Sequence, residues 1–171
     1  LYVSADGKDT IGGGAGNDTI RSYGEDDLLN GGDGNDLISA GIGADTVDGG
    51  DGIDTITFDE SGRGVSLDLS QGIGLTQDAQ GDVYLNIENV TGSRFADLLI
   101  GNAGANEIDG LAGNDVLFGH GGNDLVRGNT GNDQVFGDRG TNSSVHGNDS
   151  LFGEEGDDTL SGDGGIDTFF G

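Results

Sequence analysis

The chain of 171 residues contains no cysteine, proline, methionine or tryptophan. Without cysteine, neither a disulfide nor a thiolate metal site is possible. No apolar run approaches the roughly 20 residues of a membrane-spanning helix, and the sequence shows no signal-peptide pattern. Aromatic residues are few, so a thick globular core is not expected. Because methionine is absent, Leu1 is not a translation start, and we expect the sequence to be a segment of a longer chain.

Basic residues are scarce as well: 6 Lys and Arg stand against 32 Asp and Glu, giving a net charge of −26. This balance excludes nucleic acid and anionic membranes as direct partners, because phosphates are bound by Lys and Arg. The few basic groups are scattered, so a catalytic cluster is not expected either, and the chain is predicted not to be an enzyme. A disordered acidic segment is the alternative. Fixed offsets between the acids, glycines and aliphatic residues argue against disorder.

Glycine is the abundant residue, with 38 copies, and it marks a repeat. Residues 31–39 read GGDGNDLIS and fit the pattern G-G-x-G-x-D-x-U-x at every position, where U is a large aliphatic residue. Residues 13–21 and 49–57 repeat the pattern eighteen residues before and after. This period and pattern are typical of a parallel β-helix that binds calcium.

The nonapeptides form two blocks, residues 4–57 and 92–171, and the second contains an insertion near 141–147. Residues 58–91 break the register; they are either wider coils of the same sheets, with a longer loop near 72–82, or a spacer between two rolls. Position six of the repeats is occupied in the first block by Asp9, Asp18, Asp27, Asp36, Asp45 and Asp54, and in the second by Asp97, Asn106, Asp115, Asp124, Asp133, Asp149, Asp158 and Asp167.

The repeat chemistry points to Ca²⁺. Glycines at positions one, two and four adopt positive φ without steric cost, so the loop can turn its carbonyls toward one point. The Asp at position six adds a carboxylate there, and hard oxygen ligands suit Ca²⁺. Position eight then lies in a short strand and points inward. The sequence therefore predicts an all-β parallel roll with calcium in its turns.

Two nonapeptides make one coil, so turns eighteen residues apart stack on the same edge. Each ion is expected between stacked turns, with one Asp from each. Neighbouring pairs give four sites in the first block and six in the second, about ten in all. Sites that use Asn106 and Asp27 are expected to be the weakest. Because facing Asp residues repel each other without ions, we expect the chain to be disordered without calcium and folded with it.

These repeats resemble the hemolysin-type calcium-binding repeats of RTX proteins. The resemblance implies a right-handed parallel β-roll, type I secretion from a Gram-negative bacterium, and folding in extracellular calcium. It also implies that loop carbonyls join the Asp ligands. In this chain that applies to Gly13, Gly14, Gly16, Gly31, Gly32, Gly34, Gly49, Gly50 and Gly52.

Position nine should face solvent, yet Ile100, Phe118 and Phe136 recur there at a spacing of eighteen. They form either a ladder that stabilises the sheet or a face that docks a glycan or a partner protein. His120 and His146 are expected to be solvated loop residues. The leading hypothesis for function is a non-catalytic, calcium-responsive module that supports the attached domains of a larger secreted protein. A glycan-binding module is the alternative.

Overall fold

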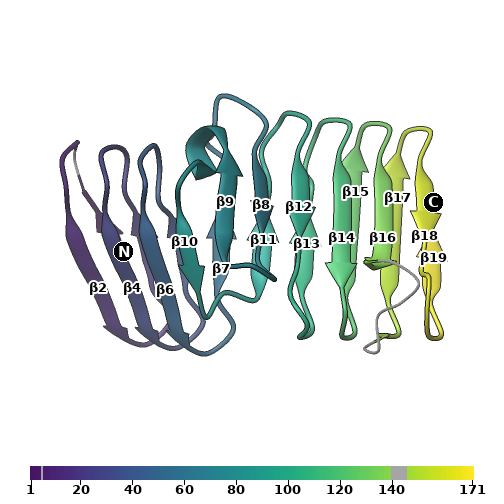
Figure 1. Ribbon diagram of the computed structural model, residues 1–171, viewed down its shortest axis with the longest axis horizontal. Helices are drawn as coiled ribbons and strands as arrows, with labels where there is room; N and C mark the ends of the chain where they lie inside the picture. The colour runs from purple at the N-terminus through teal and green to yellow at the C-terminus, as the bar shows by residue number, and fades with distance from the viewer. Residues whose placement is uncertain (5, 140–145) are drawn as a thin grey trace.

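The computed structural model describes residues 1–4, 6–139 and 146–171, so most of the insertion predicted near 141–147 lies outside the described residues. The described chain is an all-β solenoid in which successive strands, except those within residues 66–85, alternate between two sheets (Figure 1). This confirms the predicted β-roll. The 3₁₀ helix η1 (Gln77–Ala79) is the one helical element among these residues. None of the described helices has the length and apolar character needed to cross a membrane.

Outside residues 66–85, each sheet contains every second strand. The nine-stranded sheet is, in spatial order, β1 (Tyr2–Val3), β3 (Thr19–Arg21), β5 (Leu37–Ser39), β7 (Thr55–Thr57), β11 (Asn89–Thr91), β13 (Glu107–Asp109), β15 (Leu125–Thr130), β17 (Ser150–Glu155) and β19 (Thr168–Phe170). The ten-stranded sheet is β18 (Thr159–Ser161), β16 (Gln134–Asp138), β14 (Val116–His120), β12 (Leu98–Ile100), β8 (Ser66–Asp68), β9 (Ile73–Thr76), β10 (Val83–Leu85), β6 (Thr46–Asp51), β4 (Leu28–Asp33) and β2 (Thr10–Ala15).

The register of the strands follows the eighteen-residue period. Ile20 pairs with Ile38, and Ile38 with Ile56, in parallel strands. Their side chains point between the sheets and form a narrow core together with those from the other sheet. Its fully buried members at position eight are Ile20, Leu29, Ile38, Val47, Ile56, Leu99, Ile108, Leu117, Val126, Val135 and Leu151. Burial of each side chain stabilises the fold by roughly 1.5–3 kcal/mol. The core is therefore thin for a chain of such high charge.

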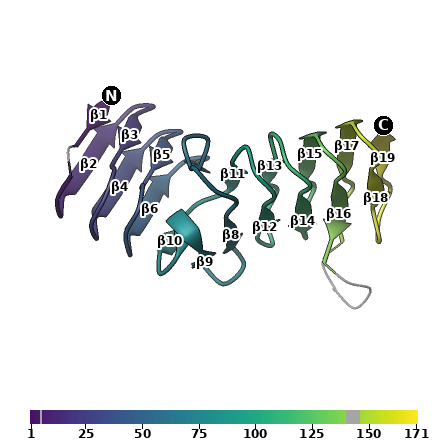
Figure 2. The ribbon, with the colours of Figure 1, turned by 90° about the horizontal axis from the view of Figure 1, so that it is seen from above.

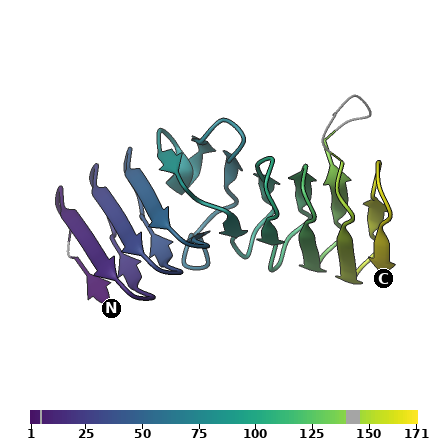
Figure 3. The same ribbon diagram turned by 90° about the horizontal axis from the view of Figure 1, so that it is seen from below.

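Both sheets continue across residues 58–91. In the nine-stranded sheet β11 lies directly between β7 and β13, with Val90 opposite Ile56 and Ile108. In the ten-stranded sheet β10 pairs with β6 and β8 pairs with β12, both parallel, while β9 is antiparallel to both its neighbours. Figures 2 and 3 show the solenoid bending where these strands lie. The division into residues 4–57, 58–91 and 92–171 as separate units stays a prediction.

Candidate metal centre

The position-six side chains stack along the two edges of the roll, where each precedes a strand. On the edge that leads into the nine-stranded sheet, the backbone N–H of one residue donates to the carboxylate Oδ1 of the next. The N–O distances are 2.7 Å from Asp18 to Asp36 and 2.7 Å from Asp36 to Asp54. This row, which we call the long ladder, comprises Asp18, Asp36, Asp54, Glu88, Asn106, Asp124, Asp149 and Asp167.

The opposite edge carries a row in two parts, the split ladder. Its first part is Asp9, Asp27, Asp45 and Asp82, and its second is Asp97, Asp115, Asp133 and Asp158. The first part ends at Asp82, whose Oδ2 accepts a 2.7 Å hydrogen bond from the Tyr84 hydroxyl. The second begins where Asp97 Oδ1 accepts the N–H of Val65, a residue without a carboxylate. The break falls at the hairpin of β9 and β10.

The second carboxylate oxygen of many ladder residues has no hydrogen-bond donor. Among the described residues, a buried Oδ2 without a partner occurs at Asp36, Asp45, Asp54, Asp115, Asp124, Asp133 and Asp149. A buried anionic oxygen without a partner is costly, because desolvation is not offset by any hydrogen bond. A bound cation would offset this cost at these oxygens.

The glycine at position one leaves a space at each of these oxygens except that of Asp45, whose repeat has Ala40 at position one. A Cβ added to Gly31 would lie 2.2 Å from Asp36 Oδ2 and 2.4 Å from the carbonyl oxygen of Gly49 in the next coil. A Cβ on Gly13 would similarly lie 2.9 Å from Asp18 Oδ2 and 2.5 Å from the Gly31 carbonyl oxygen. A carboxylate and a carbonyl from adjacent turns thus converge where a side chain would otherwise stand.

The other predicted loop glycines also lie in stacked turns. Position two and position four take positive φ, the left-handed region that favours glycine. This holds at Gly14, Gly16, Gly32, Gly34, Gly50 and Gly52. A Cβ on Gly50 would lie 2.1 Å from the carbonyl oxygen of Gly32, so adjacent turns approach too closely for any other residue.

We call each pair of neighbouring residues in a ladder a step. At three of the ten predicted steps, a group of the protein donates a hydrogen bond where a cation is expected. The Ser22 hydroxyl donates to Asp27 Oδ2. Ser93 donates to both oxygens of Asp97, at 2.6 Å from its N–H and 2.8 Å from its hydroxyl. Asn106 has an amide, whose Nδ2 donates to the backbone oxygen of Glu88 at 2.6 Å. Because the side chains of Asp27, Asp97 and Asn106 already have these hydrogen-bond partners, the steps that follow them have less need of a cation than the other steps.

Burial raises the pKa of several ladder carboxyls. Desolvation is the largest cause in each case, and neighbouring carboxylates add to it. The pKa rises to about 7 at Asp115, about 8 at Asp124 and about 6 at Asp149. On the split ladder it rises to about 7 at Asp45 and about 6 at Asp82. The folded protein alone therefore keeps these five carboxyls protonated to a higher pH than an ordinary Asp, and a bound cation would reverse this preference.

The available metal ligands suit Ca²⁺ better than a softer metal. Within residues 1–4, 6–139 and 146–171, no three His, Cys, Asp or Glu side chains gather into a metal-binding group. A cation in these turns would be held by carboxylates of two stacked residues and by backbone carbonyls. All of these are hard oxygen ligands, as Ca²⁺ prefers.

Sequence spacing missed two members of the ladders, Asp82 and Glu88. A signal for Glu88 was present, since it stands nine residues before Asp97, and Val90 likewise stands nine before Leu99. Asp82 follows Asp45 by 37 residues, with a reversed hairpin between them, so no nonapeptide count reaches it.

The outer face proposed for docking is partly covered. Ile100 is only 3 % exposed, contrary to its predicted exposure at position nine. Phe118 and Phe136 are half-buried and stack on each other, with ring centroids 4.8 Å apart. Arg139 crosses toward β8 and pairs with Asp68 at 3.0 Å. The observed contacts are those of a ladder that stabilises the sheet.

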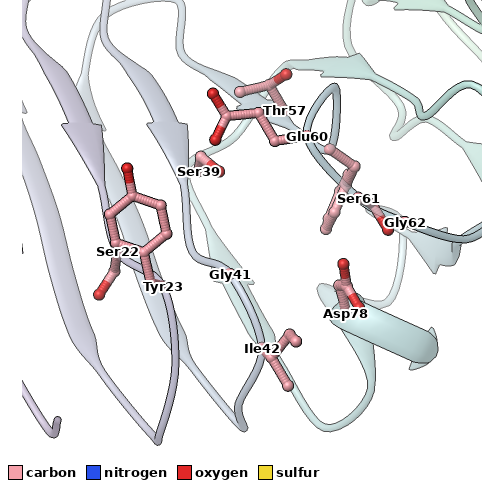
Figure 4. A pocket seen from close by; sticks show the side chains of 11 residues that line it. Ser22, Tyr23, Ser39, Gly41, Ile42, Thr57, Glu60, Ser61, Gly62 and Asp78 are labelled. Atoms are coloured by element: carbon pink, nitrogen blue, oxygen red, sulfur yellow. The ribbon is translucent and has the colours of Figure 1, made fainter. Parts of the chain in front are cut away.

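A pocket of about 270 Å³ lies at the end of the first part of the split ladder (Figure 4). One side is lined by Tyr23 and Ile42, which come from two stacked turns. The other is lined by Glu60, Ser61 and Asp78 of residues 58–91, which we call the interruption. The Ile42 N–H donates to the Tyr23 carbonyl at 2.9 Å, so these two turns still stack. The pocket marks the place where stacking stops on this edge.

The expectation that both histidines are solvated loop residues holds for His146, which is exposed, but not for His120, which is half-buried at the end of β14. His146 Nδ1 lies 3.0 Å from Oδ2 of the fully buried Asp138, and His120 Nδ1 is buried on the neighbouring strand. Gly164 makes room for this contact, because a Cβ there would lie 2.3 Å from His146 Nδ1. The pair ties the chain beyond the insertion to the end of β16.

Comparison with known families agrees with this geometry. The family model of the RTX calcium-binding nonapeptide repeat matches in four copies, over residues 4–20, 22–56, 91–126, 112–143 and 147–169. The matched segments cover most of the chain and leave out residues 57–90. No curated protein matches the chain.

Proposed function

The chain belongs to the RTX calcium-binding nonapeptide repeat family, and on this premise we propose that it is a module that folds on binding calcium in its stacked turns. The family is a structural calcium-binding module rather than a catalytic one. The observation that carries the proposal is the set of seven buried Asp Oδ2 atoms without donors among the described residues, six of which lie beside the space left by a position-one glycine.

We place the ions at steps that join two ladder Asp residues across a position-one glycine and that lack a protein donor. These steps are Asp18–Asp36, Asp36–Asp54, Asp124–Asp149, Asp149–Asp167, Asp115–Asp133 and Asp133–Asp158. We therefore expect about six ions in the repeats, below the ten that spacing alone suggests. Ser22, Ser93 and Asn106 supply donors at three of the other four steps. At the fourth, Asp9–Asp27, position one is Ser4 rather than glycine.

The wider role follows from where such a module folds. Extracellular calcium is high enough to load sites of modest affinity, with dissociation constants of roughly 10⁻⁴–10⁻³ M. We propose that the chain passes through a type I secretion system of a Gram-negative bacterium unfolded, and folds outside the cell. Folded, it would stabilise or space the attached domains of a larger secreted protein.

Replacing single ladder residues tests the assignment. Asp36 takes part in two steps, with Asp18 and with Asp54, whereas Asp18 takes part in one step with the same glycine pattern. We expect Asp36→Ala to bind two calcium ions fewer than the wild type, and Asp18→Ala one fewer, by native mass spectrometry. Equal losses in the two variants would show that the ions do not lie between stacked turns.

A further inference from the structure

The long ladder crosses the interruption at a turn that the repeat pattern does not match. Residues 86–88 join β10 to β11 and lie outside the matched segments. The N–H of Asp54 donates to Glu88 Oε2 at 2.9 Å, just as the N–H of Asp36 donates to Asp54 Oδ1 at 2.7 Å. Glu88 therefore occupies the place of the next Asp in the ladder.

The backbone of this turn also supplies the carbonyl that a repeat would supply. A Cβ added to Gly49 would lie 2.1 Å from the carbonyl oxygen of Asn86 and 2.5 Å from Asp54 Oδ2. At Gly31 the same two roles belong to the Gly49 carbonyl, at 2.4 Å, and Asp36 Oδ2, at 2.2 Å. Asp54 is 0 % exposed, and its Oδ2 has no hydrogen-bond donor.

Asn86 is suited to this position although it is not a glycine. Its φ of 51° is in the left-handed region, which Asn tolerates better than most residues. Its side-chain Nδ2 donates to Asp48 Oδ1 at 2.8 Å, which holds the turn against β6. From Asn86 to Glu88 the turn is shorter than a repeat loop, and the extra methylene of Glu lets its carboxylate reach Asp54.

The far side of the turn is satisfied by hydrogen bonds instead. Asn106 Nδ2 donates to the backbone oxygen of Glu88 at 2.6 Å, and Asn102 Nδ2 donates to that of Ile87 at 3.0 Å. These amides take up the carbonyls that face the second block. The donor-free oxygens of this turn therefore face the first block alone.

We propose that Asp54, Glu88 and the Asn86 carbonyl hold a Ca²⁺ ion outside the nonapeptide repeats, at the junction of the two blocks. This site rests on the proposed function, since it assumes that the same ladder binds calcium in the repeats. Its ligands come from residues 54 and 86–88, so the ion ties the last turn of the first block to the turn that precedes β11.

The test is a calcium count by native mass spectrometry on the 171-residue chain. Glu88→Gln is expected to bind one ion fewer than the wild type. The control, Asp78→Asn, removes one charge from residues 58–91, but Asp78 is not a member of the long ladder, and the variant is expected to leave the count unchanged. Equal counts for wild type and Glu88→Gln would overturn this site alone. A wild type that binds no calcium would overturn the proposed function as well.

A second variant keeps the test valid if Glu88→Gln does not fold. Glu88→Asp retains the charge but shortens the reach to the site. It is expected to weaken one ion by roughly tenfold, since affinity depends on ligand geometry and charge, and to leave the other ions unchanged in a calcium titration. An unchanged affinity for every ion would contradict the proposal.

Discussion

Excess chelator at pH 8 is expected to abolish the parallel β structure of the chain, with loss of most of its far-ultraviolet circular dichroism signal. The reason is the balance between charge and core. The described residues bury a narrow core of mainly aliphatic side chains, while the ladders place acidic groups of a chain of net charge −26 in adjacent turns. Without cations the buried carboxylates repel one another and remain unpaired. A β signal that persists in chelator would contradict this expectation.

Acid provides the control for this experiment. The pKa values of Asp115 and Asp124 are raised in the fold to about 7 and about 8 from an ordinary value of 3.8. A raised carboxyl pKa stabilises the fold fully below the unfolded value, and this contribution is lost as the pH rises through the folded value. In chelator, structure should therefore return as the pH falls from 8 to 4. No recovery would show that carboxylate charge is not what unfolds the chain.

Gly31→Ala is expected to remove one calcium ion and to destabilise the calcium-loaded fold by about 1–3 kcal/mol, or roughly 3–10 °C in Tm. The added Cβ would lie 2.2 Å from Asp36 Oδ2 and 2.4 Å from the Gly49 carbonyl, so it would occupy the space where these oxygens converge. Native mass spectrometry and thermal melting in calcium give the two readouts.

Gly12→Ala is the matched control for this substitution. Gly12 lies in the same block, its φ is not in the left-handed region, and a Cβ there meets no atom within 4 Å. We expect it to keep every ion and a nearly unchanged Tm. If Gly31→Ala behaved like Gly12→Ala, the space beside the position-one glycine would not be the calcium site.

The nonapeptide spacing predicted the fold and the stacking partners because both depend on the backbone period. Eighteen residues per coil place Ile20, Ile38 and Ile56 in register, and the same period aligns the Asp residues before those strands. The register also reaches Glu88, nine residues before Asp97, although the surrounding glycines are missing.

Other features depend on side-chain geometry that spacing does not encode. The hydroxyl donors that Ser22 and Ser93 give to the ladder depend on single side chains at positions one and two. The reversed order of β8, β9 and β10 in their sheet places Asp82 beside Asp45, across 37 residues of sequence. The burial of Ile100 likewise depends on tertiary contacts that no periodicity reveals.

The most direct test of the account is an anomalous difference map from crystals of the calcium-loaded chain. We expect peaks at the six steps named above, where the carboxylate Oδ2 atoms have no hydrogen-bond donor. We expect one more peak between Asp54, Asn86 and Glu88. We expect no peak at the steps that follow Asp27, Asp97 and Asn106, where Ser22, Ser93 and the Asn amide act as donors. Peaks at those three steps, or none between the stacked aspartates, would contradict the account.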